Sequence, residues 1–302
     1  MNARRRSILA LAAAACATGP RMALSSPIPL KRRIPRDGTE LPAVGLGTWQ
    51  VFDVGAGASE RAGLKEVLKL FAELGGTVVD SSPMYGRAEG VVGDLTAELG
   101  LREKLFFATK VWTGGRDAGI RQMENSFKRM RTARMDLMQV HNLLDVAVHQ
   151  KTLREWKAAG RIRYLGITHY HAGAHEELGR LLETREWDFA QFNYSMAERE
   201  AEARLLPLCA ELGVAVIINR PFAEGALFRR VKGREPPPWC AEFDCASWAQ
   251  FFLKWILSHP AVTCAIPGTG RAAHLRDNLQ AGLGRLPDAP MRRRMVEYLE
   301  RL

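Results

Sequence analysis

From residue 44 onward, short apolar runs alternate with longer segments in which apolar residues recur every three or four positions. The short runs, rich in Val, Ile and Phe, are typical of buried β-strands, and the longer segments are typical of amphipathic helices. The expected strands cover residues 44–47, 77–80, 105–110, 137–141, 164–168, 189–193, 214–219 and 264–267. The expected helices cover residues 60–74, 89–99, 120–131, 150–159, 174–182, 201–212, 247–258 and 274–281.

Strands that alternate with helices favour parallel pairing, and eight such units are typical of an α/β protein with a (β/α)8 TIM barrel. Before the first unit, residues 31–42 predict an N-terminal β-hairpin that turns at Asp37-Gly38. After the last unit, only a short C-terminal tail, with a helix over 291–301, remains. Residues 28–302 are therefore expected to form one barrel, interrupted by a long, proline-rich surface loop over 229–244.

Four residues with ionisable side chains, Asp80, Tyr85, Lys110 and His141, lie at or just after the ends of the second, third and fourth expected strands. The carboxyl ends of barrel strands meet at one face, where active sites form. A single Tyr, Lys or His at a strand end is most often structural. Four complementary groups at successive strand ends instead indicate one catalytic site.

These four groups match the needs of carbonyl reduction by hydride transfer. Tyr85 can donate a proton to the carbonyl oxygen, although a free phenol has a pKa near ~10. The ammonium of Lys110 is expected to lower that pKa, and Asp80 to keep the lysine charged and oriented. His141 is expected to hydrogen-bond the carbonyl oxygen.

The same strand ends carry motifs that resemble the aldo-keto reductase family over nearly all of residues 31–285. The motifs are Leu46-Gly47-Thr48-Trp49, Asp80-x4-Tyr85-Gly86, Thr109-Lys110-Val111-Trp112 and Val140-His141-Asn142. The resemblance implies a catalytic tetrad of Asp80, Tyr85, Lys110 and His141, and NADPH as the cofactor with NADH as an alternative.

The resemblance also implies residues that bind the cofactor. Near the nicotinamide they are Thr48, Trp49, Asp80, Thr168, His169 and Gln191, and His169 replaces the family's usual amide. Asn219-Arg220-Pro221-Phe222 replaces the family's Tyr-Ser-Pro-Leu, so the ring that stacks on nicotinamide is missing unless Phe222 substitutes for it. At the adenosine end the implied residues are Thr269, Arg271, Asp277 and Asn278, with Arg276 beside them.

The expected function is reduction of a small-molecule aldehyde or ketone, with Tyr85 as the proton donor. The substrate is expected to contact Trp49, Tyr85, Trp112 and His141, and the rim to include Trp239. A nucleotide-binding regulatory barrel with little turnover is the alternative, which a large exposed apolar patch for a partner would favour. A metal-dependent barrel enzyme is disfavoured because clustered carboxylates and metal-ligand spacing are lacking, so no metal is expected.

Charge argues against a nucleic-acid partner. The chain has a net charge of +10, but residues 1–36 hold eight Lys or Arg and no acidic residue, so the remainder is close to neutral. Arg4-Arg5-Arg6 followed by an Ala-rich apolar run predicts an export signal over 1–27, of the twin-arginine type, and a periplasmic location. The run is too short to span a membrane. The chain is expected to be cytoplasmic if this leader does not function, and a monomer in either case.

The cysteines show no metal-binding spacing. Cys240 and Cys245 flank one loop, so that they either pair in an oxidising compartment or remain isolated buried thiols.

Overall fold

A computed structural model describes residues 29–302, so the expected export signal lies outside the described residues. The described chain begins with the predicted hairpin, in which β1 (Lys31–Arg33) pairs antiparallel with β2 (Glu40–Pro42). Its turn contains Gly38 at φ 75°, a conformation that glycine adopts without steric cost.

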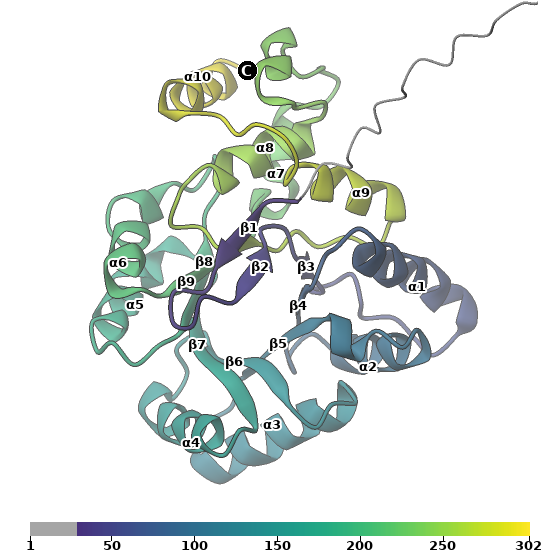
Figure 1. Ribbon diagram of the computed structural model, residues 1–302, viewed down its shortest axis with the longest axis vertical. Coiled ribbons are helices and arrows are strands. Elements are labelled where there is room, and N and C mark those ends of the chain that lie inside the picture. Colours follow the sequence, from purple (N-terminus) through teal and green to yellow (C-terminus); the bar gives the residue numbers. More distant parts are fainter. Residues whose placement is uncertain (1–28) are drawn as a thin grey trace, which may run out of the picture.

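Eight parallel strands form the barrel, as the alternation of elements predicts (Figure 1). They are β3 (Leu46–Gly47), β4 (Val78–Asp80), β5 (Phe106–Val111), β6 (Met135–His141), β7 (Ile162–Thr168), β8 (Phe189–Asn193), β9 (Ala215–Asn219) and β10 (Cys264–Ala265). The strands pair in chain order from β3 to β10. Single bridges from Val44 to Ala265 and from Gly47 to Gly268 join the last strand to the first.

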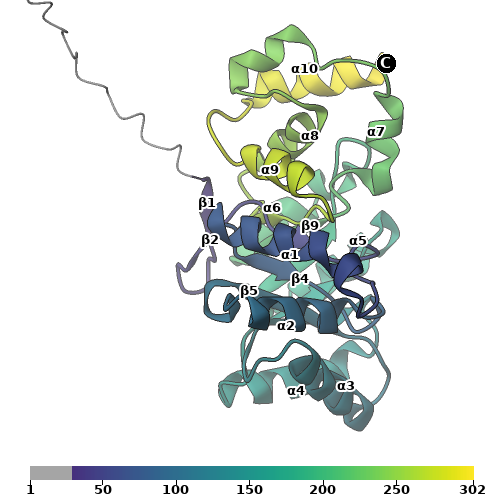
Figure 2. The same ribbon diagram turned by 90° about the vertical axis from the view of Figure 1, so that its right-hand side faces the viewer.

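Helices surround the barrel, and the last of them, at the C-terminus, lies farther from the strands than the others do (Figures 1 and 2). They are α1 (Ala58–Glu73), α2 (Ala88–Glu98), α3 (Arg116–Arg129), α4 (Val146–Ala158), α5 (His175–Leu182), α6 (Leu205–Leu212), α7 (Ala226–Arg230), α8 (Trp248–Leu257), α9 (Ala272–Gln280) and α10 (Ala289–Glu300). Short 3-10 helices cover Arg102–Lys104, Ala172–Ala174, Glu200–Glu202, Ala223–Gly225 and Pro238–Phe243.

The connection over residues 229–244 differs from the expected irregular loop. The helix α7 ends inside it, and a 3-10 helix begins at Pro238, whose fixed φ suits a first helical position. Val231 and Phe243 are buried, and the Phe243 ring lies 6.3 Å from that of Phe251 on α8. The apolar residues of this connection therefore belong to the core.

Side chains along each strand alternate between two buried hydrophobic clusters. One cluster fills the barrel and includes Val78, Phe106, Leu137, Tyr164, Phe189 and Ile217, with Ile34 and Leu41 from the hairpin side. The next residue of each strand belongs to the cluster between barrel and helices: Val79, Phe107, Met138, Leu165, Ala190 and Ile218. Because side chains alternate with period two, the inward-facing set continues towards the carboxyl ends as Asp80, Lys110, His141, Thr168, Gln191 and Asn219. The same alternation that builds the apolar interior thus gathers the polar residues.

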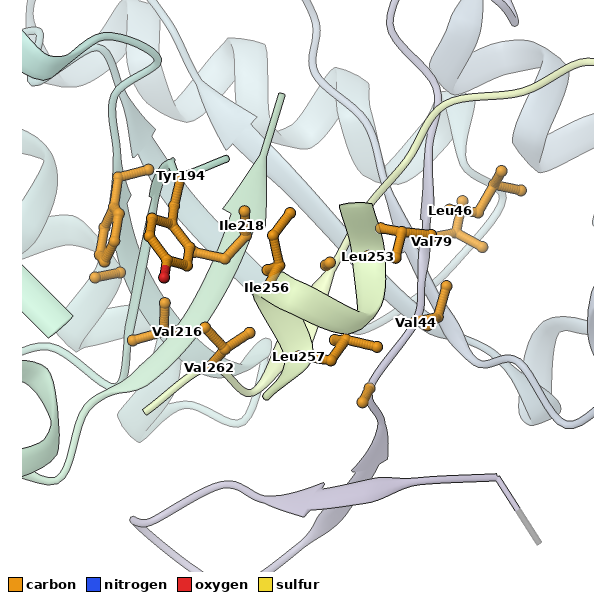
Figure 3. Close-up of a cluster of buried hydrophobic side chains, with 14 of the residues drawn as sticks. Val44, Leu46, Val79, Tyr194, Val216, Ile218, Leu253, Ile256, Leu257 and Val262 are labelled. Carbon is orange, nitrogen blue, oxygen red and sulfur yellow. The ribbon is translucent and has the colours of Figure 1, made fainter. Parts of the chain in front are cut away.

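Helix α8 packs on the outside of the barrel near the point where it closes. Figure 3 shows Leu253, Ile256 and Leu257 of this helix among side chains from both ends of the strand order, including Val44 and Ile218. All five belong to one buried cluster. This packing holds the last strands against the first.

Replacement of Leu253 by alanine should lower the free energy of unfolding by about 2–5 kcal/mol, because a fully buried leucine leaves a cavity when it is truncated. Urea denaturation measures this loss. The matched control is Leu144→Ala, since Leu144 is 40% exposed and should change stability by no more than ~0.5 kcal/mol. Equal effects of the two substitutions would contradict the packing role of α8.

Candidate functional site

A cavity of about 730 Å³ opens at the carboxyl ends of the barrel strands. Most of the residues that the sequence nominates for the site line it, namely Thr48, Trp49, Asp80, Tyr85, Trp112, His141, Thr168, Gln191, Asn219, Arg220, Pro221 and Phe222. Lys110 is fully buried and bonded to Asp80. The remaining nominated residues do not line the cavity: His169, Thr269, Arg271, Asp277 and Asn278.

A buried ion pair joins β4 to β5 at the cavity. Lys110 Nζ lies 2.5 Å from Asp80 Oδ2 and donates to the Ser81 carbonyl oxygen at 2.7 Å. The other carboxylate oxygen of Asp80 accepts from Gln139 Nε2 at 3.2 Å and from Gln191 Nε2 at 2.9 Å. The pair is therefore charge-balanced and hydrogen-bonded, as burial of two charges requires.

Tyr85 lies next to this pair, with Lys110 Nζ 5.1 Å from the centre of its ring. Burial raises the pKa of the Tyr85 phenol, and the positive charge of Lys110 lowers it by less than burial raises it. The net direction is opposite to the one that the sequence suggests, because sequence alone does not reveal how deeply the phenol is buried. Tyr85 consequently holds its proton at neutral pH, as a proton donor must.

His141 is held in its neutral form. Burial, the charge of Lys110 and the nearby His169 lower the pKa of His141 to about 2. Its Nδ1 is hydrogen-bonded to Ser82 Oγ at 3.0 Å, which leaves Nε2 without a hydrogen-bond partner among residues 29–302. Its ring meets that of Tyr85 edge-on, with 6.0 Å between centres. A neutral imidazole beside a protonated phenol can orient a carbonyl oxygen by hydrogen bonding.

The cavity is also lined by amides with unused acceptors. Asn219 Nδ2 donates to the His169 carbonyl oxygen at 3.1 Å, while the buried Oδ1 atoms of Asn219 and Asn142 have no partner among the described residues. Thr168 Oγ1 donates to Gln191 Oε1 at 3.1 Å. Since buried acceptors are normally paired, the cavity suits a ligand that supplies hydrogen-bond donors.

Arg220, in the cavity wall, contacts residues from three segments of the chain. It donates to the Tyr170 carbonyl oxygen at 2.7 Å and forms ion pairs with Glu198 at 3.4 Å and Glu224 at 3.2 Å. Arg220, Ala223 and Glu224 have φ values of 49°, 47° and 51°, in the left-handed region that non-glycine residues rarely adopt. Such strain is typical of functional loops.

Aromatic residues complete this wall. Phe222, the candidate replacement for the missing stacking ring, lines the cavity and lies 4.8 Å from the ring of Phe228. His169 instead stacks on Tyr170, with 5.1 Å between ring centres.

The residues expected at the adenosine end lie around α9. Arg271 immediately precedes this helix, and its backbone N–H donates to Thr269 Oγ1 at 3.2 Å. Asp277 accepts from Ser247 Oγ at 2.8 Å and from Gln250 Nε2 at 2.6 Å, and Asn278 is buried. Asp277 therefore has structural partners at the N-terminus of α8.

Trp239 is not at the cavity rim, contrary to the expectation from the sequence. Its ring packs against Phe243, Phe251 and Tyr298 at 5.6–6.2 Å between centres. Residues 229–244 contribute nothing to the cavity lining, because their apolar side chains pack into the core.

Several residues of the site were missed by the sequence reading. They are Ser82, Met84, Gln139, Tyr170, Glu224 and Phe228. Gln139 could have been found, since it lies two residues before His141 and so faces the same way. Phe228 could not, because it lies between the expected strand over 214–219 and the expected loop over 229–244, where the sequence predicts no element.

Within residues 29–302 no group of three or more His, Cys, Asp or Glu could hold a metal ion. No helix in this part of the chain is long and apolar enough to cross a membrane. Cys209, Cys240, Cys245 and Cys264 are free and buried, so Cys240 and Cys245 do not pair in this structure.

The model of the Aldo/keto reductase family matches residues 43–294, and the chain belongs to this family. Methylglyoxal reductase YeaE of Escherichia coli strain K12 is 34% identical, over 79% of this chain and 84% of that protein. The NADH-specific methylglyoxal reductase of the same strain is 25% identical, over 89% and 100%. A Klebsiella pneumoniae aldo/keto reductase solved with NADP and acetate superposes with a TM-score of 0.74 at 26% identity, covering 87% of this chain and 93% of that one.

The neutral state of His141 makes stability depend on pH. The unfolded chain protonates this histidine below about pH 6.5 and the folded protein does not, so acid favours unfolding. Between pH 6.5 and 5 this difference in protonation lowers the free energy of unfolding by about 2 kcal/mol. His141→Gln should therefore show a smaller loss of unfolding free energy from pH 7.5 to 5 than the parent, measured by urea denaturation. His274→Gln, at an exposed histidine, is the control and should lose as much unfolding free energy as the parent. If His141→Gln also loses as much as the parent, His141 is not the buried neutral histidine.

Proposed function

We propose that this protein reduces aldehydes or ketones with NADPH, using Tyr85 as the proton donor. The buried Asp80–Lys110 pair beside Tyr85 and neutral His141, all at one cavity, is the observation that carries the proposal. Membership of the family and the printed activities of relatives, among them a methylglyoxal reductase and an L-glyceraldehyde 3-phosphate reductase from Escherichia coli, support it.

In this mechanism the bound NADPH supplies the hydride that reaches the carbonyl carbon. His141 fixes the carbonyl oxygen, and Tyr85 transfers its phenolic proton to that oxygen as negative charge develops there. The ammonium of Lys110 stabilises the phenolate that is left, because a positive charge nearby favours the ionised phenol. Asp80 keeps Lys110 charged and in place.

The cofactor would contact Asn219, Thr168 and Gln191, which line the cavity. The unpaired Oδ1 of Asn219 would accept from the cofactor, while Thr168 and Gln191 would hold the nicotinamide carboxamide. Phe222 is the ring available to pack against the nicotinamide. Complexes of Klebsiella pneumoniae relatives with NADP and NADPH favour NADPH, and the NADH-specific relative keeps NADH as the alternative.

The regulatory alternative would need an apolar surface for a partner protein. Exposed large apolar residues do occur, but Trp49, Trp112 and Phe228 line the concave cavity. Apolar residues around a pocket suit a small ligand, so they favour the enzyme.

We also propose that the protein is exported. The arginine-rich, apolar leader supports a twin-arginine route to the periplasm, and this route would allow a folded protein to carry bound nucleotide with it. Without a functional leader the reductase would act in the cytoplasm. We further infer a monomer, and the mass of the purified protein under native conditions tests both its oligomeric state and its mature N-terminus.

Tyr85→Phe should lower kcat by about 10²–10⁴-fold, because the substitution removes the proton donor and leaves the ring. Affinity for NADPH, measured by fluorescence titration, should survive, since the nucleotide is held by other residues. Turnover in Tyr85→Phe equal to that of the parent would refute the assignment. Tyr170→Phe is the control for loss of a hydroxyl elsewhere at the cavity.

Arg271→Ala should weaken NADPH binding and leave NADH binding nearly unchanged. Arg271 precedes the N-terminus of α9, where helix dipole and backbone N–H groups favour an anion such as the 2′-phosphate. Loss of one charge-assisted contact corresponds to about tenfold or more in the dissociation constant. Isothermal titration with both nucleotides measures it, with Arg276→Ala compared in parallel. Equal weakening of both nucleotides, or of neither, would mean that the 2′-phosphate is held elsewhere.

A further inference from the structure

Two cysteines lie at the two ends of one helix-terminating turn, outside the cavity. The 3-10 helix Pro238–Phe243 ends at Asp244, which has the left-handed φ of 54°. The Asp244 N–H donates to the Ala241 carbonyl oxygen at 3.3 Å. Outside this bond, the Cys245 N–H donates to the Cys240 carbonyl oxygen at 3.1 Å. Two nested bonds of this kind form a Schellman motif, in which the side chains of the first and last of six residues commonly meet.

The backbone of this turn suits a disulfide between Cys240 and Cys245. With standard bond lengths, the hydrogen bond between them keeps their Cα atoms within about 7 Å of each other. Disulfides span Cα separations of about 4.4–6.8 Å. The two thiols already form a hydrogen bond with each other. A bond between the sulfurs therefore requires rotation of two side chains on the backbone as it stands.

Neighbouring segments hold this turn in place. The Asp244 carboxylate accepts from the backbone N–H, Nε and Nη2 of Arg285 at 2.9–3.0 Å, in the connection between α9 and α10. Lys254 on α8 donates to the Leu283 and Arg285 carbonyl oxygens at 2.6 and 2.9 Å. The left-handed conformation of Asp244 is unfavourable for a non-glycine residue, and its bonds to Arg285 stabilise it. The turn that carries both cysteines is consequently held in one conformation.

The Cys245 thiol differs in acidity from the other thiols of residues 29–302. The hydrogen bond with Cys240 lowers the pKa of Cys245 more than burial raises it, and the charge of Lys254 lowers it further. At Cys209 burial raises the pKa to about 12, and burial also raises the pKa of Cys264. The thiolate is the nucleophile in disulfide exchange, so Cys245 is the thiol best suited to attack an oxidant. It is also less deeply buried than Cys240.

We propose that Cys240 and Cys245 form a reversible disulfide when the folded protein meets a disulfide oxidant such as glutathione disulfide. The Cys245 thiolate attacks one sulfur of the oxidant, and the other sulfur leaves as a thiolate. Cys240 then loses its proton and attacks the Cys245 sulfur of the mixed disulfide, which releases the second thiol. The two cysteines lose two electrons to the oxidant, whose two thiols take up the two protons that the cysteines lose.

This modification goes beyond the proposed reductase activity and does not depend on it, because neither cysteine lines the cavity. It agrees with the proposed export of the chain, since disulfides persist in oxidising compartments. The bond would fasten the connection that leads from α7 into α8. Helix α8 in turn packs where the last barrel strands meet the first.

Alkylation and mass spectrometry test the disulfide directly. Reduced full-length protein is incubated overnight with excess glutathione disulfide, then unfolded in acid, alkylated with N-ethylmaleimide and digested with trypsin. Both cysteines fall in one tryptic peptide, over 235–254, which holds no other cysteine. This peptide should be two hydrogens lighter and unalkylated, and dithiothreitol should restore its two thiols. The peptides that contain Cys209 and Cys264 are internal controls and should be alkylated. Full alkylation of peptide 235–254, or a glutathione adduct that persists on it, would overturn the proposal.

Single substitutions test the order of attack. In Cys240→Ser the reaction should stop at a mixed disulfide between Cys245 and glutathione, because the second thiol is missing. In Cys245→Ser the adduct on Cys240 should form at least about tenfold more slowly, since the more acidic and less buried thiol has been removed. Equal rates of adduct formation in the two variants would refute the attack by Cys245. Circular dichroism confirms that both variants are folded.

Oxidation should also raise the melting temperature. A disulfide that closes the six-residue turn restricts the unfolded chain modestly, so Tm should rise by about 2–5 °C in a protein of this size. Cys240→Ser, treated in the same way, should show no such rise. A Tm that falls on oxidation would mean that the bond strains the turn and would overturn the proposal. The alkylation pattern and the Tm are read without any turnover, so they stand whether or not an aldehyde is reduced.

Discussion

The ion pair between Asp80 and Lys110 is the interaction on which the site depends. Two charges buried away from water cost several kcal/mol each unless they are paired and their other hydrogen bonds are satisfied. Here the partners come from four strands, since β4 and β5 supply the pair, β6 supplies Gln139 and β8 supplies Gln191. Only a closed, parallel arrangement brings these strand ends together. The closed barrel is therefore required for burying the charged Asp80–Lys110 pair as well as for burying the apolar core.

This pair also sets the protonation of its neighbours. The ammonium of Lys110 opposes a second positive charge, and together with burial it keeps His141 neutral. Burial outweighs that ammonium at Tyr85 and keeps the phenol protonated, but the nearby charge remains to stabilise the phenolate once a proton has left. One fixed cation thus favours a neutral imidazole before reaction and an ionised phenol after it. The proton transfer that we propose for Tyr85 would draw on both effects.

The sequence predicted whatever depends on periodicity and order along the chain. All eight strands follow from short apolar runs between helical segments, and the hairpin follows from its turn at Asp37-Gly38. Gln139 was not among the predicted site residues, although alternation with period two places it on the same face as His141. The contacts of Arg220 could not be predicted, because Tyr170 and Glu198 lie in the loops after β7 and β8, and no spacing pattern encodes their approach to Arg220. The predicted direction of the pKa shift at Tyr85 was wrong for a related reason. Burial is a property of the assembled barrel, and the sequence supplied only the neighbouring charge.

The segment between β9 and α7 shows how local strain and long-range contacts combine at the cavity wall. Each non-glycine residue held in a sparsely populated conformation costs on the order of 1–3 kcal/mol. Arg220 and Glu224 both adopt such conformations, and the ion pair between them, with the bond from Arg220 to Tyr170, holds the turn in that shape. The turn leads into α7, which carries Phe228 to the cavity wall. The Arg220 guanidinium that holds the turn thereby also fixes the position of an apolar ring at the cavity.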